Sequence, residues 1–174
     1  INVVSGITKF SQADFTTMSK GNLKIAFVSL YPFEKGFFLN NYFKNAITAW
    51  LANIVTSVGF QRIRFIQNHL DYFQDLVNEY NFLKNSSKNY KINNIDYSWD
   101  FASSCDELTE SFYKNNKINV ILTIEGAHIL NSGLSVFGYK TRENEILNNI
   151  KKIKDWEHPP FFITFAHNFN NELC

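Results

Sequence analysis

An acid, a glycine and a histidine follow directly on an apolar run in the second half of the chain. The run Val120–Ile124 is rich in branched residues, and Glu125, Gly126 and His128 come after it. Branched apolar residues in a short run favour a buried strand. Active sites of α/β proteins lie at the carboxyl ends of such strands, where a carboxylate and an imidazole can take part in binding or catalysis. These residues are therefore the first candidate site.

A second apolar run also ends on polar groups. Phe161–Ala166 is followed by His167 and by several asparagines. A histidine that closes a buried strand needs a hydrogen-bonding partner, and the asparagines supply polar neighbours. If both runs are parallel strands, Glu125 and His167 emerge at the same edge of one sheet. That shared edge is the main functional inference from the residues themselves.

Each candidate has a structural alternative. A Glu after a strand is commonly a solvated turn residue, so Glu125 alone does not define a site. His128 could equally be a core histidine that bonds a loop carbonyl, and His69 and His158 are interpreted as structural or surface residues. The sequence contains no phosphate-binding glycine loop, serine nucleophile elbow or close His/Cys metal cluster.

The elements that would position these residues alternate between strands and helices. Apolar strands separated by helical stretches indicate α/β architecture with a parallel sheet, because parallel neighbours need crossover connections. The polar stretch 84–94 is expected to be a loop. The expected strands are Leu23–Tyr31, Ile118–Ile124 and Phe161–Ala166, and the expected helices cover residues 12–20, 62–83, 105–114 and 141–156.

Helix boundaries follow from capping residues. Ser11 or Gln12 is expected near the start of the first helix, with Gly21 after its end, and Thr141 is expected to cap the last. Ser104 and Glu107 have the spacing of a capping box. The last helix is expected to bury one face, formed by Ile146, Leu147, Ile150, Ile153 and Trp156.

Between the first strand and the helix at 62–83, residues 34–59 are dense in aromatic side chains. One helix is expected there, over residues 42–57, between Gly36 and Gly59. We interpret this stretch as a helical insertion that serves as a lid or a subunit contact. An exposed aromatic insertion makes a homodimer plausible.

Composition limits the classes of function. The 174 residues are 45% hydrophobic, which suits a single domain, 1–174, and the formal net charge of +1 gives no basic field for nucleic acid. No apolar run is long enough to span a membrane. Two distant cysteines give no disulfide framework, which fits a reducing cytoplasm.

Three segments together resemble the renal (membrane) dipeptidases, which are zinc metallopeptidases of the amidohydrolase-like superfamily. SQADFTTMSKGNLKIAFVSLYP, at residues 11–32, resembles the family's Gln-x-Asp helix, glycine and second barrel strand. ILTIEGAH, at 121–128, is similar to its Val-Glu-Gly-Gly-His signature, with Ala127 at the second glycine. FFITFAHNFNNE, at 161–172, is similar to its Leu-Thr-Leu-Thr-His segment.

The resemblance implies a (β/α)₈ barrel that hydrolyses dipeptides with two divalent metal ions, expected to be zinc. It implies that Glu125 bridges the two metals and that His167 contacts the dipeptide-like substrate and stabilises the tetrahedral intermediate. Gly126 would let the backbone pass close to the metals, and His128 would support the site without binding metal.

The family's other metal ligands have no counterpart in this chain. They are a His-x-Asp on the first strand, histidines on the fifth and sixth strands, and an acid on the last. We therefore expect a fragment that covers barrel strands two to four. Two other functions stay open, namely a related amidohydrolase that acts on another small amide or lactone, and a non-catalytic barrel-fold binding protein.

Overall fold

The computed structural model describes residues 14–38, 50, 53, 59–68, 70–140, 142–166 and 173. The chain divides into two compact units, one formed by residues 1–11 and 33–72 and the other by residues 12–32 and 73–174. The predicted insertion at about 34–59 falls within the first unit. Its expected helix at 42–57 lies almost entirely outside the described residues.

The first unit contains the short 3₁₀ helix η1, Lys35–Phe38, and the helix α4, Phe60–Asn68, which buries Ile63 and Ile66. The prediction of one long helix over 62–83 was wrong, because a second helix, α5, runs separately over Tyr72–Asn85. Leu70 and Asp71 lie outside both helices. Asp71 precedes α5 directly, at a position where aspartate favours a new helix start over continuation of the old one.

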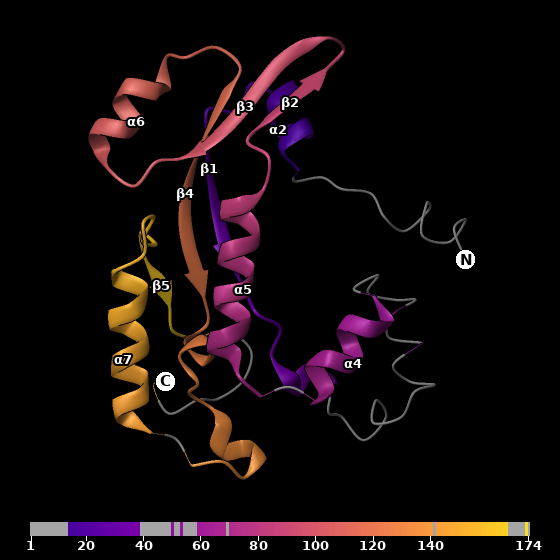
Figure 1. Ribbon diagram of the computed structural model, residues 1–174, viewed down its shortest axis with the longest axis vertical. Helices are drawn as coiled ribbons and strands as arrows, with labels where there is room; N and C mark the ends of the chain where they lie inside the picture. The colour runs from indigo at the N-terminus through magenta and orange to yellow at the C-terminus, as the bar shows by residue number, and fades with distance from the viewer. Residues whose placement is uncertain are drawn as a thin grey trace. The chain divides into compact units, whose positions relative to one another are not determined.

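The larger unit is built on one mixed, mostly parallel sheet (Figure 1). The central strand β4 pairs in parallel with three others. Along one edge it meets β1, and along the other it meets β3 at its beginning and β5 at its end. The strands are β1 (Ile25–Leu30), β2 (Asn89–Ile92), β3 (Ile95–Phe101), β4 (Lys117–Glu125) and β5 (Ile163–Thr164).

The two faces of the sheet differ because side chains alternate along each strand. Ala26 and Leu30 of β1 lie on the same face as Val120, Leu122 and Ile124 of β4, and all five are buried in the main core. Helix α5 and helix α7, Glu143–Lys154, pack on this face through Leu76, Tyr80, Ile146 and Ile153. We call it the helix-covered face, and Figure 1 shows α5 running beside β1 and α7 beside β5.

The opposite face carries Phe27, Ser29, Thr123 and Glu125, and we call it the Glu125 face. Near the beginning of β4, the fully buried Asn119 lies on this face and accepts a hydrogen bond from Ser111 of helix α6, Cys105–Phe112. Helix α6 therefore packs against the beginning of the Glu125 face, far along β4 from Glu125 itself.

The start of α6 follows its predicted chemistry, whereas α2 begins later than predicted and at a different cap. Ser104 caps α6 by accepting the amide hydrogen of Glu107, and Glu107 in turn accepts the amide hydrogen of Ser103. Helix α2, Phe15–Lys20, is capped by Asp14 and followed by Gly21. The predicted caps Ser11, Gln12 and Thr141 lie outside the described residues.

The predicted loop at 84–94 contains part of a β-hairpin, so this prediction was wrong. Strands β2 and β3 pair antiparallel, and Asn93 and Asn94 join them with φ angles of 50° and 64°. Asparagine tolerates this left-handed conformation, and two such residues form the turn that suits the twist of a hairpin. The hairpin places Trp99 against Phe15 of α2, with ring centroids 4.7 Å apart.

The strand predicted at Phe161–Ala166 exists but is short and is not buried. Only Ile163 and Thr164 form β5, and Phe161, Phe162 and Phe165 are 48–74% exposed. The predicted buried face of α7 is confirmed for Ile146, Ile153 and Trp156, which are buried in the core or pack against it, but not for its other two residues. Leu147 and Ile150 are exposed, whereas Asn149 is buried because its side-chain amide donates to the Leu130 carbonyl.

The described strands thus form an α/β fold with an open, mostly parallel sheet. No helix in the described residues is long and apolar enough to cross a membrane.

Candidate functional site

Glu125 is the last residue of β4, and its partly exposed side chain lies at the carboxyl end of this strand. It pairs with Thr164 of β5, so both side chains project from the same face. Two residues earlier on that face, the hydroxyls of Thr123 and Ser29 lie 2.6 Å apart and share a hydrogen bond. The carboxylate is thus the charged end of a row of hydroxyl groups contributed by three parallel strands.

Gly126 makes the turn that follows the strand. Its φ of 90° is one that residues with a side chain rarely adopt. Its amide donates to the Thr164 carbonyl at 2.8 Å, and the amide of Ala127 donates to the Phe165 carbonyl at 3.0 Å. Glycine therefore allows the chain to turn immediately after the carboxylate while it stays bonded to the β5 segment.

His128 is buried and its ring is held at the end of β1. Its side chain is 3% exposed, and Nε2 donates to the Pro32 carbonyl at 2.8 Å. A carbonyl oxygen only accepts hydrogen bonds, so Nε2 carries a proton and is not available as a metal ligand. The ring also packs edge-on against Tyr31. His128 therefore fastens the end of β1 to the segment that follows β4, which is the structural alternative considered for it.

The segment from Ala127 to Ser132, which includes the 3₁₀ helix η2 (Ala127–Leu130), is buried throughout. Asn131 holds it to both covering helices, because its Oδ1 accepts the Phe73 amide hydrogen and its Nδ2 donates to Glu145 Oε1. Ser132 donates to the Ala127 carbonyl at 2.8 Å. Sequence reasoning did not predict this network. An asparagine before a Ser-Gly pair was the available signal for a left-handed turn.

The other histidines contribute nothing to the Glu125 site as described. His167, the predicted substrate contact, and His69 lie outside the described residues. His158 lies on the connection before β5 and interacts with Ser103 and Phe101. Within the described residues, no three His, Cys, Asp or Glu side chains form a group that could hold a metal ion.

No protein-family model matches this sequence, and the searches of curated proteins and of solved structures gave no match. The resemblance to the renal dipeptidases therefore stays a prediction drawn from three motifs. The structure defines the class, an α/β protein that presents a carboxylate at the end of its central parallel strand.

Proposed function

We propose that this chain is part of a zinc-dependent dipeptidase whose binuclear metal site lies at the carboxyl ends of the strands of a (β/α)₈ barrel. The observation that carries the proposal is the position of Glu125, a carboxylate at the end of the central parallel strand, immediately before a glycine with positive φ. This is the position that the motif ILTIEGAH assigns to the metal-bridging acid.

The order of three strands supports the barrel. Strands β1, β4 and β5 occur in this order along the chain, with the hairpin β2–β3 between β1 and β4, and they are parallel and pair as β1–β4–β5. Parallel neighbours with helices on one face are the repeating unit of such a barrel. The hairpin β2–β3, which pairs with the beginning of β4, is an addition to that unit.

Glu125 could supply the bridging carboxylate of the proposed metal pair. A carboxylate has two oxygens and can contact two cations about 4 Å apart. His128 does not offer Nε2 as a ligand, since that nitrogen donates to the Pro32 carbonyl. Two bound zinc ions would supply a water of lowered pKa and would polarise the scissile carbonyl. Glu125 would fix their separation, and the proposal assigns a hydrogen bond to the developing oxyanion to His167.

The test uses the complete polypeptide that contains this chain, with Glu125→Gln as the variant and Glu110→Gln, an exposed acid on α6, as the matched control. We expect Glu125→Gln to lower kcat/KM for dipeptides by roughly 100-fold or more, because even residues that only support metal ligands cost 10- to 100-fold. Glu110→Gln should leave activity unchanged. Equal activity of the two variants would reject the role of Glu125.

A substrate panel separates the alternatives. Hydrolysis of dipeptides above simple amides and lactones supports the dipeptidase, and the reverse preference supports a related amidohydrolase. Absence of both activities, together with absence of zinc binding, would support the non-catalytic binding protein.

A further inference from the structure

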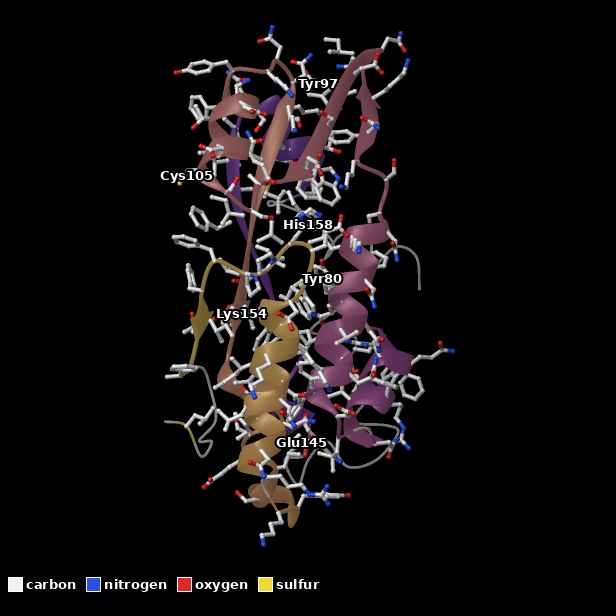
Figure 2. All side chains as sticks on the ribbon, turned by 60° about the vertical axis from the view of Figure 1, so that its left-hand side comes forward. Tyr80, Tyr97, Cys105, Glu145, Lys154 and His158 are labelled. Carbon is white, nitrogen blue, oxygen red and sulfur yellow. The ribbon has the colours of Figure 1, made fainter. Side chains whose placement is uncertain are left out.

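The connection from α7 to β5, residues 155–162, is held at one point by a histidine that contacts three other elements. The His158 ring stacks on Phe101 of β3, with centroids 4.4 Å apart. Its Nδ1 is hydrogen-bonded to the hydroxyl of Ser103, just before α6, at 3.1 Å. Its backbone amide donates to the Tyr80 hydroxyl of α5 at 3.2 Å. Figure 2 shows His158 and Tyr80 next to each other where the connection passes α5.

The strand that follows is short, and it is held to β4 mainly by backbone hydrogen bonds, such as those from the Phe161 amide to the Leu122 carbonyl and from the Ile124 amide to the Phe162 carbonyl. β5 contributes only two residues to the sheet, and its neighbours Phe161, Phe162 and Phe165 are largely exposed. Trp156, which stacks on Tyr80 at 4.1 Å, and the ion pair Lys84–Glu157 hold the connection before His158. Neither of these contacts changes its charge state near pH 6. His158 is thus the group in this junction whose charge changes between pH 7 and pH 5.

We propose that His158 is an acid-sensitive latch, which holds the α7–β5 connection against β3 and α6 when neutral and loosens β5 from β4 when protonated. The neutral ring can accept the Ser103 hydroxyl hydrogen at Nδ1. The protonated ring must donate there, so the hydroxyl has to reverse its direction. This inference concerns the attachment of β5 and does not depend on the proposed metal site.

The groups around the His158 ring determine whether its pKa is raised or lowered. Burial lowers the pKa of His158, and Lys88, just before β2, acts in the same direction. Glu157 on the connection, whose Oε1 lies 3.7 Å from Nε2 of the ring, Asp100 of β3 and Glu107 of α6 act to raise the pKa. Lys84 of α5 forms an ion pair with Glu157. The net pKa lies below its ordinary value of 6.5. The detached state is therefore protonated first, and the attachment weakens as pH falls below about 6.5.

Amide hydrogen exchange at pH 7.5 and pH 5.5, corrected for the intrinsic rates, tests the latch. Two amides report on the β5 edge of β4, since the Phe161 amide donates to Leu122 and the Gly126 amide to Thr164. The Asn119 amide, which donates to Lys24 beside β1, is the internal control. We expect the β5-edge amides to lose protection at pH 5.5, by up to about tenfold, because pH 5.5 lies one unit below the ordinary pKa of 6.5. The control amide should keep its protection.

Variants separate the latch from general acid destabilisation. His158→Phe preserves a ring for stacking on Phe101 and removes the titrating group, so the acid-induced loss of protection should disappear. Lys88→Gln should shrink that loss and Glu157→Gln should enlarge it, because the two side chains shift the pKa of His158 in opposite directions. Unchanged protection in the natural protein, an equal loss at Asn119, or the same response in Lys88→Gln and Glu157→Gln would overturn the proposal.

Discussion

Two segments border Glu125, and they are held in opposite ways. The segment that follows it, Ala127–Ser132, is buried, and its own His128 and Asn131 side chains bond to the Pro32 carbonyl after β1, the Phe73 amide of α5 and the Glu145 carboxylate of α7. The strand that pairs beside it, β5, has two paired residues and largely exposed neighbours. Glu125 therefore stands between a buried segment fixed by side-chain hydrogen bonds and a short strand whose neighbouring side chains are largely exposed.

The comparison predicts the largest effect for a core truncation in the buried segment. Leu130 is fully buried in η2, so Leu130→Ala should lower the free energy of unfolding by about 2–5 kcal/mol. Phe162→Ala, in the half-exposed segment at β5, should cost only about 1 kcal/mol. Urea denaturation measures both. Comparable losses in the two variants would show that the two segments are packed alike.

Asn131 provides the next test, because it holds the buried segment by hydrogen bonds. Asn131→Gly keeps the left-handed backbone but leaves the Phe73 amide without its acceptor, and should cost about 1–3 kcal/mol. Asn131→Ala should cost more, since alanine also resists a φ of 66°. Thermal or urea unfolding of both variants shows which of them loses more stability. A smaller loss for alanine than for glycine would contradict the backbone argument.

The smallest change in stability is expected for a substitution of Asp100, a residue of β3 close to the connection that leads to β5. Burial acts to raise the pKa of Asp100, but the hydrogen bond and charge of Lys88, the Phe101 amide and Lys117 outweigh it, and the pKa is lowered. Asp100 thus adds stability above about pH 4 that is lost as pH falls through the lowered pKa.

Asp100→Asn should cost less than about 1 kcal/mol at pH 7, because the side chain is 42% exposed and solvent screens the pair. It should also flatten the fall in stability below about pH 4. Urea denaturation at pH 7 and pH 3 measures both effects, with Asp96→Asn in the exposed Lys91–Asp96 pair as the control. If Asp100→Asn left the pH dependence of stability unchanged, Asp100 would not contribute to it.

The strands and their polar ends could be predicted because branched apolar runs and capping residues act locally. Strands β1 and β4, the α6 cap at Ser104 and the position of Glu125 at a strand end are confirmed. The hairpin was missed although Asn93 and Asn94 carry the turn, because the flanking residues are polar and their pairing depends on β4.

Burial was the property that the sequence predicted least well. The apolar run FFITFA, residues 161–166, was predicted to be buried, but the sequence does not show which elements would cover it. Most of these side chains are exposed. Asn149 is buried in place of Leu147 because the Leu130 carbonyl needs a donor. Polar partners of this kind are set by tertiary contacts that no local pattern contains.

The central claim is that Glu125 joins two metal ions, and metal stoichiometry tests it most directly. The zinc content of the complete polypeptide, measured by elemental analysis after dialysis, should be two ions per chain under our proposal. Glu125→Gln should bind at least one ion fewer, whereas Glu110→Gln should bind the full number. Equal zinc content in Glu125→Gln and the natural protein would contradict the account.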